Sequence, residues 1–555
     1  MISASPGFPQ PRATSMRIRH LLLIPPALLA APAAAQPDPA ARVDSLFAAW
    51  NNPQSPGCAV GVAQNGRTLL SRAYGSANLE HDIPNTPETI FEAGSVSKQF
   101  TAAAVVLLAR QGKLSLDDDV RRHIPEVPDY GTPITLRHLM NHTSGLRDWG
   151  SVMQLAGWPR GTRIYTHPYA LDVISRQKSL NFTPGTEYSY SNTGYNLLAM
   201  VVERVSGMSF AEFSRRELFQ PLGMTRTEWR DDFTRTVKGR ASAYVWSDSA
   251  WHLQMPFENI HGNGGLLTTV GDLLRWNQAL DSGSVAGLDT LTTQGVLSNG
   301  RRIEYAMGLS VGEFRGLREV SHSGATAGYR AYLARYPETG VSVALLCNAG
   351  NTNPGLAIRA ASLFMADRLG PEDGPVATMP VAVEAAELER RAGVYRSRRT
   401  GAPLRMVMAE GKLRTGGGTE LVPIGRSVFS FGTAGTRVEF VDGTPVQVRI
   451  VYPDGDTVMY EPAAPADTSA ANLAAYTGEY RSDEAEATYT VAVVDGVLVL
   501  RMRPETTIRL NPTYADAFGG PGGAIVRFIR GADGRVQAFS IGTERVRELR
   551  FDRAR

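Results

Sequence analysis

The residues best suited to chemistry begin with a serine and a lysine three positions apart, Ser95 and Lys98. Residues at this spacing share one face of a helix, so the amine lies beside the hydroxyl and lowers the cost of deprotonating it. The same spacing in Ser175 and Lys178 shows that the motif alone is weak, and we interpret that pair as an exposed helix end. Ser95 is preferred because Gly94 precedes it and an apolar helix follows. This context predicts a nucleophile whose neighbouring backbone N–H groups face an acyl oxyanion.

A second group lies in a loop rich in Gly, Ser and Tyr, residues 184–194, which carries Tyr190 and Asn192. Tyrosine is a poor base at its usual pKa of about 10, but a neighbouring ammonium favours the phenolate. Tyr190 is therefore a candidate to take the proton of Ser95. The amide of Asn192 can donate to a substrate carbonyl while it accepts from Lys98. Read alone, Tyr-x-Asn is most often loop packing.

A third segment, His322 to Ala325, closes a predicted strand. Gly324 would let a substrate backbone approach, and the N–H of Ala325 could form half of an oxyanion hole. Alone, this segment would more often be a plain strand end. The three segments together predict one site, with Ser95, Lys98 and Tyr190 as catalytic residues and Asn192, His322, Gly324 and Ala325 at the substrate and the oxyanion.

The site needs a rigid frame, which the surrounding pattern predicts. Residues 58–71 read as a β-hairpin around Asn65-Gly66, and the helix predicted over 95–110 is apolar on every side at its centre, as in a helix buried in the protein. Further helices are predicted at 135–141, 169–176, 195–206 and from the N-cap Thr269, and further strands at 302–314, 319–322, 329–336 and 341–347. Strands at both ends around central helices indicate an α/β sandwich.

The rest of the chain reads as nearly all β after a Pro/Gly-rich linker at 370–375. It contains an internal repeat at a constant offset of 85 residues. The repeated positions are Leu388, Gly393, Tyr395, Arg396, Ser397, Gly411 and Leu413, which recur as Leu473, Gly478, Tyr480, Arg481, Ser482, Gly496 and Leu498. Each unit is expected to close into a small antiparallel barrel. The predicted domains are therefore 36–370, 381–462 and 468–555.

The first 35 residues differ from the others and predict a cleaved signal peptide. A basic segment at 16–19 precedes an apolar run at 21–31, and Ala33 to Ala35 resemble a signal-peptidase site. A membrane anchor is the alternative, but the run is about half the ~20 residues that span a bilayer and is interrupted by Pro25 and Pro26. No later stretch is apolar for long enough. We expect a periplasmic or secreted protein with no membrane span in the mature chain.

Charge and cysteine content exclude several classes of protein. The formal charge of +3 arises from three arginines in the signal segment, so the mature chain is neutral and lacks the excess of positive charge that nucleic acid or anionic membranes require. Two cysteines, Cys58 and Cys347, cannot form a zinc framework, and we expect buried unpaired thiols rather than a bridge. We predict neither a metal nor a cofactor. His138 and His142 are expected in packing or turn hydrogen bonds, and the glycine-rich loop 262–265 is expected at a substrate cleft rather than at a phosphate.

Five segments carry a resemblance to a known family: 91–98, 135–146, 190–192, 262–266 and 322–324. In them the chain resembles the penicillin-recognising serine hydrolases, the group of class C β-lactamases, D-Ala-D-Ala carboxypeptidases, family VIII esterases and D-aminopeptidases. The resemblance covers about residues 40–365. It implies a β-lactamase/transpeptidase-like α/β domain, with an antiparallel five-stranded sheet and helices on both faces, followed here by two small antiparallel barrels. It also implies an acyl-enzyme on Ser95 without metal or cofactor.

One departure from the family shapes the functional prediction. β-Lactamases of this group usually carry Lys where this chain has His322, and His is mostly neutral at pH 7. The His form and the two barrels are most similar to D-aminopeptidases and related esterases. We therefore predict hydrolysis of peptide, amide or ester bonds in a small molecule or short peptide. The alternatives are a β-lactamase or D-Ala-D-Ala carboxypeptidase, and a non-catalytic ligand-binding protein.

Overall fold

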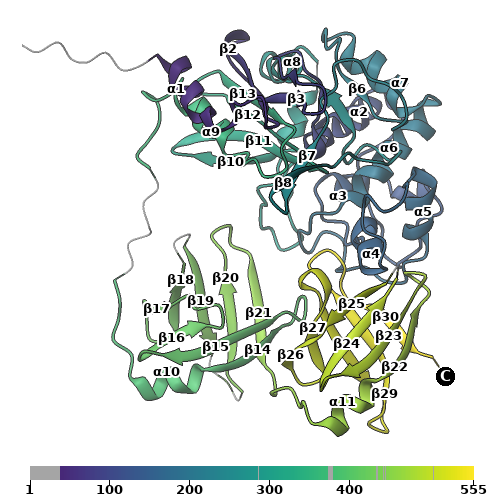
Figure 1. The fold of residues 1–555 in the computed structure, drawn as a ribbon, viewed down its shortest axis with the longest axis vertical. Coiled ribbons are helices and arrows are strands. Elements are labelled where there is room, and N and C mark those ends of the chain that lie inside the picture. Colours follow the sequence, from purple (N-terminus) through teal and green to yellow (C-terminus); the bar gives the residue numbers. More distant parts are fainter. Residues whose placement is uncertain are drawn as a thin grey trace, which may run out of the picture.

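The computed structural model describes residues 38–554 except 286, 373–378, 433–434, 442, 444 and 504. The predicted signal peptide and the centre of the interdomain linker lie outside the described residues. Figure 1 shows a domain of helices and strands above two side-by-side β domains. Within the described residues, no helix is long and apolar enough to cross a membrane.

The N-terminal domain is built on one antiparallel sheet with the strand order β10-β11-β12-β13-β1-β2. Its strands are β1 (Cys58–Gln64), β2 (Arg67–Tyr74), β10 (Ser310–Phe314), β11 (Leu317–Thr326), β12 (Tyr329–Tyr336) and β13 (Val341–Cys347). The implied count of five was wrong, because β10 pairs with β11 at the outer edge and makes six. The predicted strand 302–314 is correspondingly short, since only its last five residues join the sheet. The predicted hairpin is confirmed: Asn65 and Gly66 both have positive φ, as a tight primed turn requires.

Both faces of this sheet are covered, which explains why β1 and β13 are apolar without alternation. Alternate residues of β1 face opposite ways. Ala59 and Ala63 belong to the large core with α2 (Lys98–Arg110), whereas Val60 and Val62 pack in a second core with α1 (Pro39–Leu46) and α9 (Leu356–Ser362).

The helical part begins with a 3₁₀ turn, η2 (Gly94–Ser97), that runs directly into α2. The other helices are α3 (Leu136–Met140), α4 (Trp149–Leu155), α5 (His167–Ser175), α6 (Asn192–Ser206), α7 (Phe210–Ser214) and α8 (Val270–Ser282). The predicted N-cap is present, because the Thr269 side chain accepts from the N–H of Asp272. Helix α6 starts three residues before the predicted position, so Asn192 is its first residue.

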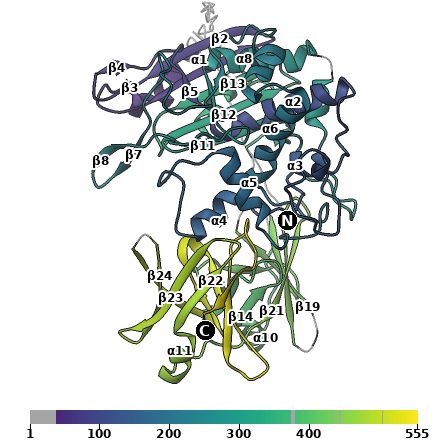
Figure 2. The same cartoon turned by 90° about the vertical axis from the view of Figure 1, so that its right-hand side faces the viewer.

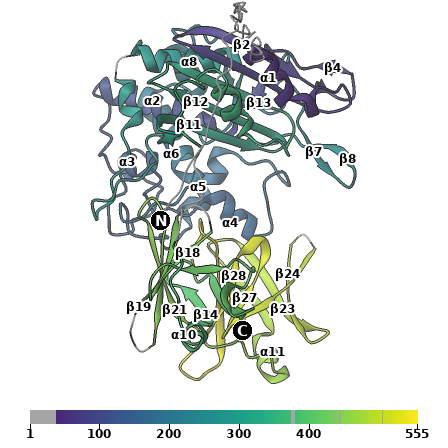
Figure 3. The ribbon, with the colours of Figure 1, turned by 90° about the vertical axis from the view of Figure 1, so that its left-hand side faces the viewer.

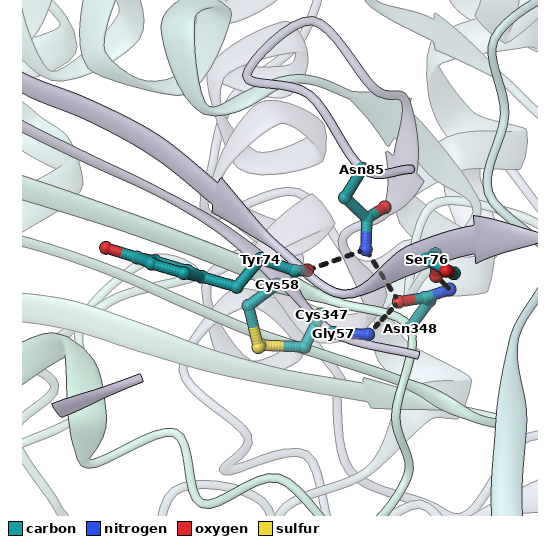
Figure 4. The surroundings of a disulfide bond; sticks show 7 residues. All are labelled: Gly57, Cys58, Tyr74, Ser76, Asn85, Cys347 and Asn348. Atoms are coloured by element: carbon teal, nitrogen blue, oxygen red, sulfur yellow. Dashed lines mark hydrogen bonds between the residues drawn. A yellow bond between two sulfur atoms is a disulfide. The ribbon is translucent and has the colours of Figure 1, made fainter. Parts of the chain in front are cut away.

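A disulfide joins β1 and β13, which are neighbours in the central sheet although they are its first and last strands along the chain. The expectation of two unpaired thiols was therefore wrong. Cys58 and Cys347 are directly opposite on β1 and β13, with Cα atoms 4.0 Å apart. The sequence does not reveal this register, which brings the two sulfurs together. Figure 4 shows the bond beside Asn348, whose amide oxygen accepts from the N–H of Gly57 at 2.8 Å and whose amide nitrogen donates to the carbonyl of Ser76 at 3.0 Å.

Each C-terminal unit is a nearly closed antiparallel barrel preceded by one short helix. The first contains α10 (Ala385–Arg391) and the strands β14 (Gly393–Ser397), β15 (Pro403–Ala409), β16 (Lys412–Thr415), β17 (Leu421–Pro423), β18 (Val428–Phe431), β19 (Thr436–Val441), β20 (Gln447–Val451) and β21 (Thr457–Pro462). The second contains α11 (Ala470–Tyr476) and the strands β22 (Gly478–Ser482), β23 (Ala487–Val494), β24 (Val497–Met502), β25 (Thr506–Arg509), β26 (Asn511–Tyr514), β27 (Ala517–Gly519), β28 (Ile525–Arg530), β29 (Val536–Gly542) and β30 (Leu549–Arg553). The repeat has a structural basis. Tyr395 donates to the carbonyl four residues earlier, and Tyr480 makes the same bond in the second barrel.

The second barrel packs against the N-terminal domain beneath α4, as Figures 2 and 3 show from opposite sides. A buried ion pair crosses this contact, from Arg147 Nη1 to Glu484 Oε2 at 2.7 Å. Arg147 also donates to the backbone carbonyls of Arg547 and Glu548. The loop 543–548 between β29 and β30 is thereby fastened to the segment that leads into α4.

Candidate active site

Ser95 and Lys98 occupy the junction of η2 and α2, at the centre of the N-terminal domain. Lys98 is fully buried, and its Nζ lies 3.1 Å from Ser95 Oγ. Two oxygens fix the amine from other sides: the Asn192 side-chain oxygen at 3.0 Å and the Asn263 backbone oxygen at 2.7 Å. The structure therefore brings together Ser95, Lys98 and Asn192, as the sequence predicts.

Close packing of backbone explains two glycines at the site. Gly94 has φ +52°, and a Cβ there would lie 2.6 Å from the N of Ala325. A Cβ on Gly324 would lie 2.0 Å from the carbonyl oxygen of Ala93. Gly324 thus allows the Ala93 carbonyl to approach closely, and it also lines the cleft over Ser95, where the sequence predicts a substrate contact. Strand β11 is pressed against η2, which places Ala325 beside Ser95, where two oxyanion donors would be needed.

Tyr190 lies over the amine of Lys98, whose Nζ is 4.8 Å from the ring centroid. Burial raises the pKa of Tyr190 above its ordinary value, and the hydrogen bond with Ser95 and the charge of Arg545 lower it by less. Burial also lowers the pKa of Lys98 well below its ordinary value, a shift that Asp148 opposes and that Arg545 and Arg160 reinforce. Both directions favour a neutral amine beside a neutral phenol. Lys98 is then the better acceptor for the serine proton, and Tyr190 the better donor.

Asp148 is a site residue that the sequence did not identify. Its carboxylate accepts from the backbone N–H of Asn192 at 2.6 Å and caps α4 through Ser151. It is the carboxylate that opposes the lowering of the Lys98 pKa. The sequence signal that could have identified Asp148 is its position in the loop directly after the segment 135–146, which carries the family resemblance.

His322 is buried beside Tyr190 in a fixed hydrogen-bond pair. Its Nδ1 lies 2.5 Å from the Ser323 carbonyl and its Nε2 lies 2.9 Å from Tyr305 Oη. A carbonyl only accepts, so Nδ1 carries the proton and Nε2 accepts from the tyrosine. Burial is the largest cause that lowers the pKa of His322 to about 4, and the charge that Lys98 carries when protonated acts in the same direction. His322 is therefore neutral at pH 7 and supplies no cation.

This depressed pKa predicts an acid-sensitive fold. Between pH 6.5 and about 4 the unfolded chain binds a proton at His322 that the folded chain does not, so stability falls as pH decreases through this window. The contribution is about 3 kcal/mol for a shift of this size. Urea unfolding of wild type and His322→Gln from pH 7 to pH 4 measures it, and the variant is expected to lose less stability. Equal losses in both proteins would contradict the assignment.

The remaining histidines and the glycine loop have structural roles. His138 completes a capping box with Thr135, and the Nδ1 of His142 accepts from the N–H of Ser191 at 3.2 Å, so the predicted turn hydrogen bonds are confirmed. The loop 262–265 lines the cleft beside Ser95 as expected. It also holds Lys98 through the Asn263 carbonyl, a role that no side-chain pattern could reveal.

One group in the described part of the chain could be considered for a metal: His167, Glu203 and His261, with one donor atom from each within 4.8 Å of the others. A tetrahedral ion with bonds of about 2.1 Å places its donors about 3.4 Å apart. In addition, the Nε2 of His167 already lies 3.1 Å from the backbone N of His261. We assign no metal chemistry to this group.

The cleft over Ser95 has a volume of about 560 Å³, and one of its lining residues, Arg545, comes from the second barrel. Its charged lining residues are all arginines, namely Arg160, Arg330 and Arg545. Arg545 lies 4.9 Å from the centroid of the Tyr190 ring. Its carbonyl accepts from the N–H of Asp148 and from the side chain of Asn181, which fixes the loop 543–548 at the site.

The chain is similar in sequence to known proteins. The sequence pattern of the beta-lactamase family matches residues 40–366. A D-aminopeptidase of Gluconobacter oxydans is 29% identical over 80% of this chain and 83% of its own length. A penicillin-binding protein of Bacillus subtilis is 34% identical over 50% of this chain, and a D-aminopeptidase of Brucella anthropi is 33% identical over 50%. These two matches span 64% and 53% of the relatives' lengths.

Solved structures support the fold. An octameric penicillin-binding protein homologue from Pyrococcus abyssi aligns with a TM-score of 0.54 and 23% identity over 76% of this chain and 99% of its own. A penicillin-binding protein from Bacillus halodurans aligns with a TM-score of 0.51 and 24% identity over 58% and 98%. The predicted fold and the predicted class of β-lactamase-related serine hydrolase are confirmed, and the chain belongs to the beta-lactamase family.

Proposed function

We propose that the protein hydrolyses amide or ester bonds of small D-aminoacyl or short-chain acyl substrates through an acyl-enzyme on Ser95. The observation that carries this proposal is the buried amine of Lys98, held 3.1 Å from the serine hydroxyl by two oxygens. Relatives named D-aminopeptidase support the choice of substrate. The neutral His322 supports it as well, because the third motif offers no permanent cation for a carboxylate.

The geometry suggests a sequence of proton transfers. The hydroxyl of Ser95 gives its proton to neutral Lys98 as the oxygen attacks the substrate carbonyl. The backbone N–H groups of Ser95 and Ala325 hold the oxyanion, and the amide of Asn192 orients the acyl group. Tyr190 passes a proton to the leaving nitrogen or oxygen, and the proton that Lys98 took from Ser95 then restores the phenol. Water then attacks the acyl-enzyme along the same path in reverse and releases the acid.

Labelling with a fluorophosphonate tests the nucleophile directly. We expect the intact mass of wild type to rise by one phosphonyl group and that of Ser95→Ala to stay unchanged, because Ser95 has the buried amine of Lys98 beside it. Ser175→Ala, which removes the serine of the matching but exposed motif, is expected to label like wild type. Label on Ser95→Ala would place the nucleophile elsewhere, and no label on wild type would favour the ligand-binding alternative.

Export to the periplasm or the exterior is part of the proposal. The basic and apolar segments at 16–31 with Ala33 to Ala35 support it. The disulfide between Cys58 and Cys347 supports it independently, because such bonds persist in oxidising compartments. Sequencing the N-terminus of the exported protein would reveal cleavage before Gln36.

A second candidate function is β-lactam or D-Ala-D-Ala recognition, favoured by the relative named penicillin-binding protein. Nitrocefin turnover separates the two candidates. We expect hydrolysis of D-alanine p-nitroanilide to exceed nitrocefin turnover in kcat/KM, and the reverse order would establish the second candidate.

A further inference from the structure

A separate cavity of about 670 Å³ lies where the two barrels meet the N-terminal domain. Its walls come from Glu304, from the β14–β15 loop and the β20–β21 turn of the first barrel, and from the second barrel near Ile525 and Thr543. Pockets of this size at domain junctions commonly hold small organic molecules. The cavity shares no lining residue with the catalytic cleft.

The cavity wall is acidic, in contrast to the cleft over Ser95. Of its carboxylates, Asp454 and Asp456 pair with Arg301, and Asp456 also pairs with Arg399. Glu304 and Glu544 form no ion pair or side-chain hydrogen bond with any residue that the structure describes. Two carboxylates of the cavity lining therefore have no ion-pair partner, because Arg399, the cation among the lining residues, pairs with Glu187 and Asp456.

Aromatic rings complete this environment. Tyr452 and Tyr460 line the cavity. Tyr452 lies in the turn between β20 and β21 and is 38% exposed. Carboxylates beside tyrosine rings favour a cation attached to an apolar body, since the rings add cation–π attraction to the ionic contact. We propose that this junction cavity binds a primary ammonium group carried on an aromatic or apolar molecule.

The position of the cavity couples it to the active site. Thr543 and Glu544 form part of its wall, while the next residue, Arg545, lines the catalytic cleft and lies over Tyr190. The Glu544 carbonyl accepts from Ser189, the residue before Tyr190. A ligand in the cavity touches the segment that positions Arg545, so its binding changes the reactivity of Ser95.

Binding is tested on the full chain with three probes of similar shape: phenethylammonium, neutral 2-phenylethanol and anionic 3-phenylpropanoate. Calorimetric titration is expected to show one site that prefers the ammonium over the alcohol by at least about 10-fold, as two exposed carboxylates together allow. The glutamate variants below assign the binding to the cavity rather than to the catalytic cleft. Equal affinity for the ammonium and the alcohol would overturn the proposal. The titration involves no turnover, so its failure would leave the serine hydrolase proposal intact.

The double variant Glu304→Gln, Glu544→Gln locates the site. We expect it to bind phenethylammonium about 10-fold more weakly than wild type. Glu313→Gln, which changes an exposed glutamate on β10 outside the cavity, is expected to bind like wild type. Unfolding temperatures are compared because an altered fold would also weaken binding. A stable double variant that binds as tightly as Glu313→Gln would refute the assignment.

Coupling is measured by the rate at which fluorophosphonate labels Ser95. Saturating phenethylammonium is expected to change this rate at least twofold in wild type and not in the double variant, and an unchanged wild-type rate would refute the coupling. Substrates with a distal lysine, compared with their ε-acetylated forms, identify the source of the ligand. A lower KM for the lysine form that the double variant abolishes assigns the ammonium to a long substrate, and equal KM values assign it to a separate effector.

Discussion

Replacement of Lys98 by alanine is expected to lower kcat/KM for D-aminoacyl amides by about 10²- to 10⁴-fold, the range for loss of a general base. The amine lies 3.1 Å from Ser95 Oγ, and burial lowers its pKa well below the ordinary value, which favours the neutral form that accepts a proton. Without it, the proton of Ser95 has only Tyr190 as an acceptor, and the raised pKa of that phenol disfavours the phenolate required. Initial rates with D-alanine p-nitroanilide across pH 5 to 10 measure the effect.

The chain provides a matched control for this change. Lys178 follows Ser175 at the same spacing but is exposed, three residues beyond the end of α5, so Lys178→Ala is expected to retain wild-type kcat/KM. A Lys98→Ala protein that unfolds at the wild-type temperature and keeps more than about a tenth of the activity would rule out Lys98 as the general base. Equal losses in both lysine variants would point to a nonspecific effect of charge.

Replacement of Arg147 by methionine is expected to destabilise the contact between the second barrel and the N-terminal domain by about 3–5 kcal/mol. The Arg147 side chain is 1% exposed and that of Glu484 is 8% exposed, so the variant leaves a buried carboxylate without its cation. The bonds from Arg147 to the carbonyls of Arg547 and Glu548 are lost as well. Urea unfolding followed by tryptophan fluorescence and by activity measures the loss. Activity is expected to fall at lower urea than fluorescence, because Arg545 leaves the cleft with the loop.

Arg204→Met is the control for a surface pair. Arg204 and Glu126 are 39% and 44% exposed, and breaking such a pair costs at most about 1 kcal/mol. If Arg147→Met were no more destabilising than Arg204→Met, the barrel contact would not depend on the buried pair, and Arg545 would need another anchor.

The sequence predicts those parts of the molecule that depend on local spacing. Ser95 and Lys98 lie within one turn of each other, and the strands 329–336 and 341–347 have the predicted bounds because their apolar patterns end at turns. The disulfide was missed because it depends on which residue of β1 faces Cys347. No local pattern specifies that register.

The missed site residues act over long separations or through backbone atoms. The Asn263 carbonyl holds Lys98 from 165 residues away, and any residue type has a carbonyl. Arg545 reaches the cleft only because a barrel docks beneath α4. The proton roles of Lys98 and Tyr190 follow from how deeply each is buried, which a list of residue types does not contain.

The disulfide also makes the N-terminal domain a covalent ring. Cys58 and Cys347 are 289 positions apart, and the ring encloses every proposed catalytic residue from Ser95 to Ala325. Helix α1 and both barrels lie outside this ring. A pulling force between residue 38 and the last barrel therefore crosses from β1 to β13 through the sulfurs and leaves the enclosed loops unloaded. Under such a force Arg545 would separate from the cleft while Ser95, Lys98 and the central sheet stay in place. Mechanical load would therefore change the cleft before it disrupted the catalytic residues.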